Sequence, residues 1–273
     1  MARHDDLIEM LRVEPGSPAR LDGRDPGVRI GADGKQAGLA RLAELVQRLG
    51  VLHNRLWAEA SRSLLLVLQG MDASGKDGTI RHVLTGVNPQ GCRVVSFREP
   101  TATELAHDYL WRVHAACPAR GELAIFNRSH YEDVVAVRVR GLASRAAWHE
   151  RFEHIRGFER MLADEGTTVV KVFLHVSRDQ QRARLRERLD DPEKRWKFRA
   201  GDLDDRRRWD DFMQAYEDAI RETSTEWAPW YVVPADHNWV RNLAVGEILV
   251  AALERIDPRL PSPEAGLDGL EIT

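Results

Sequence analysis

A glycine-rich segment directly follows an apolar run and carries the residue types best suited to chemistry. Residues 64–68 read Leu-Leu-Leu-Val-Leu, and the pattern Gly70-x4-Gly75-Lys76 comes next. Glycines at this spacing let the backbone curl so that successive N–H groups face an anion, while the lysine and the start of the following helix add positive charge. The segment therefore predicts a phosphate-binding loop. The alternative is a coincidental glycine-rich turn, which the strand before it and the helix after it disfavour.

Two carboxylates distinguish this loop from the usual one. Asp77 replaces the Ser or Thr that commonly follows the lysine and binds Mg2+, and Asp72 lies inside the loop. Two carboxylates beside a bound phosphate would repel it unless a cation intervened. We therefore expect Asp72 to hold Mg2+, whereas Asp77 would stabilise the helix N-terminus. The loop residues expected to contact phosphate or nucleotide are Gly70, Ala73, Ser74, Gly75, Lys76, Gly78 and Thr79.

A second polar cluster begins at Asn127, where another apolar run ends, and extends to Asp133. Ligands of open parallel sheets bind at the carboxyl ends of strands, so this cluster is expected beside the phosphate loop. Arg128 is suited to a bidentate contact with a phosphoryl group. Enzymes with such loops usually keep a metal-binding acid at the first position, but here the acids come later, at Glu132 and Asp133. Asn127, Arg128 and Glu132 are candidate phosphate or nucleotide contacts; a capped helix start with an ordinary ion pair is the alternative.

Further basic residues follow two other strand-like runs. Arg98 closes the run 93–97 and could reach the phosphate of an accepting nucleotide, or equally be a solvated charge. The dense cations of 178–208 are interrupted by Asp190-Asp191-Pro192, a sequence typical of a mobile flap. Such a lid would bring cations over a phosphate donor and exclude water, and a solvated helical face is the alternative. The expected lid cations are Arg178, Arg182, Lys194, Arg195 and Lys197.

The composition limits the class of protein. The chain has 273 residues, of which 43% are hydrophobic and 30% charged, enough for a sizeable core. Its net charge of -3 gives no global basic field for nucleic acid. Cys92 and Cys117 lack metal or redox spacing, no signal peptide is recognisable, and no apolar run is long enough to span a membrane. We therefore expect a cytoplasmic protein without a membrane partner.

Alternating strands and helices must position these residues. The order indicates an α/β fold with parallel strands and crossover helices on both faces. We expect an irregular arm over 1–35, one domain over 36–256 with its lid at about 178–208, and an extended tail over 257–273. The predicted strands are 64–68, 93–97, 123–126, 168–175 and 230–233, and the predicted helices are 36–60, 76–86, 103–116, 145–164, 178–189, 205–226 and 239–255.

Four segments together resemble the family-2 polyphosphate kinases. They are Leu-Gln-Gly-Met-Asp-Ala-Ser-Gly-Lys-Asp-Gly at 68–78, Val-Asn-Pro-Gln-Gly-Cys at 87–92, Phe-Asn-Arg-Ser-His-Tyr-Glu-Asp at 126–133 and Arg-Trp-Lys-Phe at 195–198. The likeness extends from about residue 36 to about residue 255, and the joint occurrence of these segments in this order is specific. Ser74, where many relatives carry glycine, is a mild departure.

The resemblance implies a P-loop kinase fold, with three α/β/α layers, a five-stranded parallel sheet and a helical lid. It implies Mg2+-dependent transfer of a terminal phosphoryl group from inorganic polyphosphate to AMP or ADP, reversible in principle. Asp72 and Asp133 would then be the metal-binding and catalytic acids, Lys76 and Arg128 would bind phosphates, and the lid cations would hold polyphosphate. The wording Ser-His-Tyr-Glu-Asp resembles members that accept AMP, or both AMP and ADP. A homo-oligomer, a dimer or tetramer, is also implied.

The physics of such a donor agrees with the cation-rich sequence. A chain made only of phosphates offers no base or sugar, so a cation-lined channel is the expected means of recognition. The expected acceptors are adenine nucleotides, with guanine nucleotides left open. Two alternatives remain: an ATP-dependent small-molecule or nucleotide kinase of the same fold, and a P-loop switch or nucleic-acid-binding ATPase. The negative net charge disfavours nucleic acid as a partner.

Overall fold

A single six-stranded sheet forms the centre of the protein, which is described over residues 2–265 by a computed structural model. The strand order is β1-β6-β5-β2-β4-β3. A short strand, β1 (Arg12–Val13), pairs antiparallel with β6 at the edge of the sheet. The prediction of five strands is therefore wrong, because it missed this sixth strand. The other strands are parallel, as predicted: β2 (Ser63–Gln69), β3 (Cys92–Ser96), β4 (Leu123–Asn127), β5 (Thr167–His175) and β6 (Trp230–Pro234).

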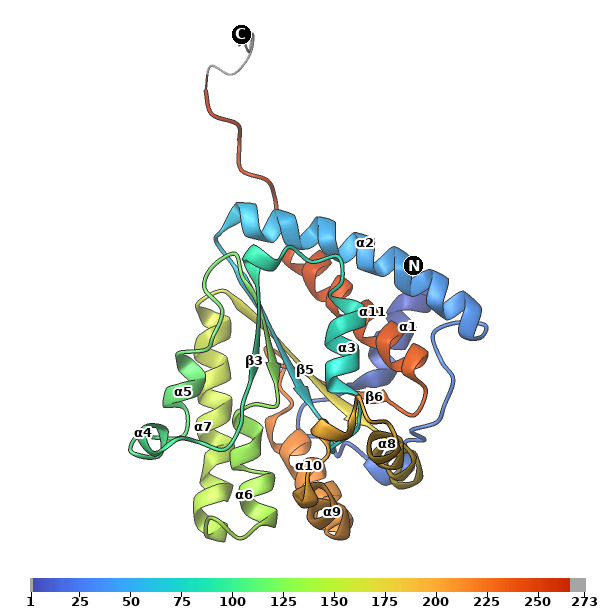
Figure 1. Cartoon of the computed structure of the whole chain (residues 1–273). Helices are drawn as coiled ribbons and strands as arrows, with labels where there is room; N and C mark the ends of the chain where they lie inside the picture. The colour runs from blue at the N-terminus through green and yellow to red at the C-terminus, as the bar shows by residue number, and fades with distance from the viewer. Residues whose placement is uncertain (1, 266–273) are drawn as a thin grey trace.

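Helices cover both faces of this sheet, which confirms the three-layer α/β/α class (Figure 1). The first face carries α1 (Ala2–Leu11), α2 (Lys35–Glu59), α3 (Lys76–Val83) and α11 (Asn238–Ile256). The opposite face carries α5 (Trp111–His114), α6 (Ala136–Val139), α7 (Arg145–Asp164) and α10 (Trp209–Thr223). All seven residues of β2 are buried, which explains why this strand is an unbroken apolar run rather than an alternating one.

The N-terminal segment differs from the predicted irregular arm. Helix α1 occupies Ala2–Leu11, and β1 follows it immediately. Leu7, Ile8 and Leu11 are buried because α1 packs on α11 and β6. Their spacing places them on one face of a helix, a stripe too short to stand out among charged neighbours. Leu7, Ile8 and Leu11 thus join the core, and the limits of the domain at 36 and 256 stay a prediction.

Two predicted helices are each divided in the structure. The run 103–116 forms α4 (Ala102–Leu105) and α5, because Asp108 accepts a hydrogen bond from the backbone of Leu110 and so favours a turn. The run 205–226 forms α9 (Ala200–Arg207) and α10. Beyond α11, residues 257–265 form no helix or strand and lead away from the body, and the rest of the predicted tail lies outside the described residues (Figure 1). Throughout residues 2–265, each helix is too short or too polar to cross a bilayer.

A fully buried polar cluster lies between β5, α7 and the segment that follows β4. The Nζ of Lys171 lies 2.5 Å from a carboxylate oxygen of Glu159 and donates to the carbonyl of Thr223 at 2.7 Å. The hydroxyl of Tyr131 donates to the second oxygen of Glu159 at 2.8 Å, and His130 lies 3.3 Å from it. The cluster anchors Tyr131 and thereby fixes the orientation of the two acids that follow it. His130 is fully buried and takes part in this cluster through its contact with Glu159.

We expect Glu159→Leu to lower the free energy of unfolding by about 3–5 kcal/mol, because it leaves the charge of Lys171 buried without its partner. Urea unfolding followed by circular dichroism measures the loss. The matched control is Glu153→Gln, an exposed acid on the same helix, α7. The double variant Lys171→Met/Glu159→Leu removes both charges and should recover much of the stability. A loss below about 0.5 kcal/mol in the single variant would contradict the argument.

Candidate active site

The loop between β2 and α3 has the backbone of a phosphate cradle. Gly70 and Gly75 have φ angles of 148° and 105°, and Ala73 also lies in the left-handed region at 60°. A Cβ atom on Gly70 would lie 2.8 Å from the carbonyl oxygen of Leu174, so the glycine is required for space as well as conformation. The N-cap residue Gly75 has no side chain to cap the first amides of α3, so these amides are left available to an anion.

Lys76 is folded back over its own loop. Its Nζ donates to the carbonyl of Gly70 at 2.7 Å and to that of Met71 at 3.2 Å. Burial, together with the charge of Arg128, lowers the pKa of Lys76 to about 8, although Asp72 opposes the shift. The ammonium group thus lies in the cradle and holds loop carbonyls that an arriving phosphate oxygen would replace as its partner.

Arg128 brings the end of β4 to the phosphate loop. Its φ of 64° is left-handed, and its guanidinium donates to Asp72 and lies 3.9 Å from Glu132. Glu132, opposed in part by burial and supported by Asp72, raises the pKa of Arg128 above its ordinary value. Burial alone would raise the pKa of Asp72, but the charges of Arg128 and Lys76 outweigh it, and the pKa lies below the ordinary value. Asp72 of the phosphate loop thus meets Arg128 and Glu132 of the segment after β4.

Asp77, the departure from the usual loop, connects three elements. Its carboxylate accepts a hydrogen bond from Asn127 Nδ2 at 2.8 Å and lies 3.7 Å from Lys197 Nζ. The first contact joins the end of β4 to the start of α3, and the second reaches the segment predicted as a lid. Asp77 therefore has specific partners in addition to its place in the first turn of α3.

Asp133 faces a different group of cations from Asp72. Its carboxylate lies 3.5 Å from Arg151, and burial, opposed by Arg151 and Arg112, raises its pKa. Across the described chain, Asp133 Oδ2 is buried without a hydrogen-bond partner, and Asp133 shares no ion pair with the phosphate loop. Arg112 donates to the carbonyl of Arg98 at 2.8 Å, which places exposed Arg98 beside this second group. Of the two adjacent acids Glu132 and Asp133, it is Glu132 that lies near Arg128.

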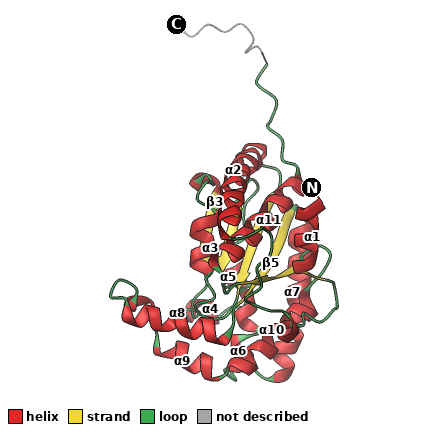
Figure 2. Ribbon diagram, turned by 90° about the vertical axis from the view of Figure 1, so that its right-hand side faces the viewer, coloured by secondary structure: helices red, strands yellow, loops and turns green. Residues whose placement is uncertain are grey.

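The predicted lid projects from the carboxyl edge of the sheet as α8 (Arg178–Asp190) and α9, which lie side by side in Figure 2. Among its predicted cations, Lys197 reaches the phosphate loop through Asp77. Arg182 and Lys194 pair with acids of their own segment, Arg195 donates to a backbone carbonyl of α8, and the carbonyl of Arg178 accepts from α9. Arg178 itself is exposed.

Other predicted loop residues are fixed by contacts with helices α8 and α11. Ser74 is fully buried, and its carbonyl accepts from Arg184 and Arg241. The Thr79 hydroxyl lies 3.5 Å from Asn242 Oδ1 of α11. A Cβ on Gly78 would lie 3.1 Å from the Arg241 guanidinium. Arg241 was not among the predicted site residues, because one arginine within an apolar helix gives no local signal of a site.

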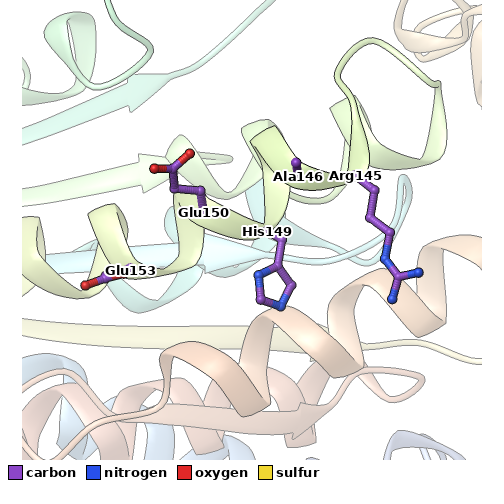
Figure 3. Close-up of a pocket in the computed structure, with 5 residues that line it drawn as sticks. All are labelled: Arg145, Ala146, His149, Glu150 and Glu153. Atoms are coloured by element: carbon purple, nitrogen blue, oxygen red, sulfur yellow. The ribbon is translucent and has the colours of Figure 1, made fainter.

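An open hollow of about 640 Å3 lies on the outer face of α7, apart from the phosphate loop. Figure 3 shows its lining side chains on successive turns of that one helix: Arg145, Ala146, His149, Glu150 and Glu153. A surface formed by a single helix encloses no ligand, so the chemistry of the site is assigned to the loop and its surrounding charges rather than to this hollow.

The fold and the site define a P-loop phosphotransferase: a parallel sheet, a glycine-rich loop leading into a helix, and Lys76 and Arg128 over the loop. The family model for polyphosphate kinase 2 (PPK2) matches residues 33–261. The chain belongs to this family, which confirms the resemblance found in its sequence.

Known relatives match most or nearly all of the chain. The AMP/ADP-polyphosphate phosphotransferase of Meiothermus ruber is 56% identical over 268 residues, covering 98% of this chain and 97% of that protein. The ADP-polyphosphate phosphotransferase of Rhodopseudomonas palustris is 48% identical over 228 residues, 79% of each chain. The crystal structure of polyphosphate kinase 2 from Arthrobacter aurescens superimposes with a TM-score of 0.92 at 42% identity, covering 96% of this chain and 93% of that one.

We expect polyphosphate binding to weaken as the pH rises through about 8, because Lys76 loses its charge there and its carbonyl partners cannot replace that charge. The affinity should fall by at most about tenfold per pH unit for one linked proton. Calorimetric titration with polyphosphate at pH values between 6.5 and 9 (roughly one to two pH units on either side of the transition) measures the affinity. Lys76→Arg keeps a charge that does not titrate in this window, so an equal decline in both proteins would exclude Lys76 as the group responsible.

Proposed function

We propose that this protein transfers the terminal phosphoryl group of inorganic polyphosphate to AMP and ADP, with Mg2+. The observation that carries the proposal is the meeting of Lys76, Arg128 and Asp72 at the phosphate loop of a family member. The name of the Meiothermus ruber relative, an AMP/ADP-polyphosphate phosphotransferase, supports both acceptors. Transfer in the reverse direction uses the same groups.

The chain's own residues act by positioning and by neutralising charge, which is most of what phosphoryl transfer requires. The amides of the loop and the first turn of α3 hold the oxygens of the transferred group. Lys76 exchanges its contacts with Gly70 and Met71 for a phosphate oxygen. Arg128 offers a planar fork of donors, and its contact with Asp72 fixes that fork beside the loop.

Mg2+ fits the donor set around Asp72. Within residues 2–265 no group of three or more acidic, histidine or cysteine side chains is arranged to hold a metal. This agrees with Mg2+, which commonly binds through one or two carboxylates together with substrate phosphates and water. Asp72, kept ionised by Arg128 and Lys76, is the carboxylate proposed to hold it. When bound, Mg2+ would neutralise negative charge on the phosphates.

We assign Asp133 and its neighbouring cations to the acceptor side of the reaction. Its buried Oδ2 lacks a partner in the described residues and so has a free acceptor position for a substrate hydroxyl, water or metal. Arg98, Arg112 and Arg151 supply positive charge for the phosphate of AMP or ADP. Asp133 remains the proposed second acid, as a metal ligand or catalytic group, and Asn127 and Glu132 remain proposed contacts between the two sides.

The polyphosphate chain is proposed to extend from the loop along the cations of α8 and the segment after it: Arg178, Arg182, Lys194, Arg195 and Lys197. Most of these side chains are exposed and pair only locally, so they can exchange acids for phosphates at little cost. Adenine rather than guanine nucleotides, a homo-oligomeric dimer or tetramer, and a cytoplasmic location stay predictions from the sequence.

The proposal predicts ADP and ATP formation when AMP or ADP is mixed with polyphosphate and Mg2+ in the absence of ATP. Ion-pair chromatography quantifies the nucleotides, and GMP and GDP are supplied in parallel to test the base. Product that forms only when ATP is the donor would reject the proposal in favour of an ATP-dependent kinase. Hydrolysis of ATP without any acceptor would favour a switch or ATPase.

We expect Asp72→Asn to reduce Mg2+-dependent turnover by about 100-fold or more, because the amide removes the charge that holds the metal and fixes Arg128. Initial rates over a Mg2+ titration measure the effect. Asp164→Asn, at an exposed acid near the end of α7, is the matched control. Near-normal activity and an unchanged Mg2+ dependence in Asp72→Asn would show that another group binds the metal.

A further inference from the structure

Three consecutive carbonyls of the phosphate loop accept hydrogen bonds from side chains of two distant helices. Gln181 Nε2, on α8, donates to the carbonyl of Asp72 at 3.0 Å. Arg184, one helical turn later, donates to the carbonyls of Ala73 at 3.0 Å and Ser74 at 3.1 Å. In Figure 1, α8 accordingly lies beside the base of α3, where the loop ends. The outer side of the loop is thus held along its length.

Arg184 joins the loop to a third segment. Its Nη1 contacts the loop, and its Nη2 donates to the carbonyls of Ala235 at 2.6 Å and Asp236 at 2.9 Å. Both carbonyls lie in the turn between β6 and α11. The same Nη2 also donates to Asn238 Oδ1 at 3.1 Å. The planar fork of one arginine therefore spans two loops at the carboxyl edge of the sheet, a geometry that a lysine cannot reproduce.

Arg241 of α11 lies against the same loop and is almost entirely buried, with 3% exposed. Its guanidinium is so close to Gly75 that a Cβ there would lie 2.0 Å from Nη1. Among the described residues it hydrogen-bonds only neutral oxygens, those of Ser74, Asn238 and Asn242. Burial, with the neighbouring charge of Arg184, lowers the pKa of Arg241 to about 9. Burying a cation without a carboxylate partner costs free energy, so we expect Arg241 to have a function at this position.

Holding these carbonyls outward has a direct consequence for the inner side of the loop. A backbone that directs successive carbonyls to one side presents its N–H groups to the other, which is the arrangement that binds an anion. We propose that Gln181, Arg184 and Arg241 are positioning residues, which hold the phosphate loop in its anion-binding conformation from behind. The inference rests on the proposed phosphoryl transfer at this loop.

The contacts also divide the predicted lid into two parts. The first two turns of α8 are fastened to the loop by Gln181 and Arg184, and α9 is fastened to them because Arg206 donates to Gln181 Oε1 at 2.9 Å. The part of the predicted lid that closes over the substrate is therefore proposed to begin after Leu185. The first two turns of α8 stay in place and support it. Movement of the remaining cations can then occur without loss of the cradle.

The test compares Arg184→Ala and Arg184→Lys in the full chain. We expect kcat for AMP phosphorylation to fall about 100-fold in Arg184→Ala, as displaced reacting groups do, while the KM for AMP stays near that of wild type. Guanidinium chloride at millimolar concentration should restore part of kcat in Arg184→Ala. Lysine at this position should not restore it, since the fork geometry rather than the charge is required.

Hydrogen exchange gives a second readout that does not depend on turnover. Amides of residues 72–76 should exchange faster in Arg184→Ala and in Gln181→Met, while those of β2 and β5 keep their protection. Arg145→Ala is the matched control, since Arg145 lies exposed on α7, apart from the loop and the lid, and makes no hydrogen bond or ion pair with any described residue. The control should leave both exchange and kcat unchanged.

Unchanged loop exchange and kcat in folded Arg184→Ala and Gln181→Met would overturn the inference. So would full recovery by lysine, which would assign the effect to charge alone, or loss of protection throughout the sheet without guanidinium rescue, which would indicate a general structural role. An inactive wild-type protein would instead reject the proposed function, and the exchange comparison would still decide whether these side chains hold the loop.

Discussion

The parallel pairing of β2 with β4 is the constraint on which the site depends. In this register Leu68 lies opposite Asn127, and the backbone of Arg128 donates to the carbonyl of Leu68 at 3.1 Å. The phosphate loop and the polar segment after β4 therefore leave the sheet at the same edge, and Arg128 reaches Asp72. A slip of one residue would turn each side chain to the other face of the sheet, so burial of both faces fixes this register strongly.

Charge around the loop is arranged in layers. Lys76 and Arg128 lie on the side where phosphate is proposed to bind, while Arg184 and Arg241 lie behind the loop carbonyls. Asp72 is the carboxylate held closest to the first pair, and burial makes all these interactions stronger than they would be in water. An excess of fixed cations around a cradle of amides suits a substrate made of phosphates, whereas a neutral substrate would leave the cost of burying these charges uncompensated.

The five parallel strands and the long helices were predictable because each is a continuous or periodic apolar pattern. Errors fall where the signal is short or where a turn competes with a helix. The two-residue strand β1 and the ten-residue helix before it are short elements, and their stability comes from packing on β6 and α11. The break between α4 and α5 at Asp108 depends on one side-chain hydrogen bond, which cannot be predicted from the periodicity of apolar residues.

The sequence by itself determined the phosphate loop, because glycine spacing, the lysine and the flanking strand and helix are local properties, and parallel topology then brought Arg128 to it. Only the tertiary structure decided which of the adjacent acids Glu132 and Asp133 lies near Arg128. Glu132 and Asp133 are neighbours in a 3-10 turn, where adjacent side chains point about 120° apart, and buried Tyr131 sets which one faces the loop. The support by Gln181, Arg184 and Arg241 was also beyond the sequence, because backbone carbonyls accept hydrogen bonds whatever residue carries them, and their donors lie more than 100 positions away.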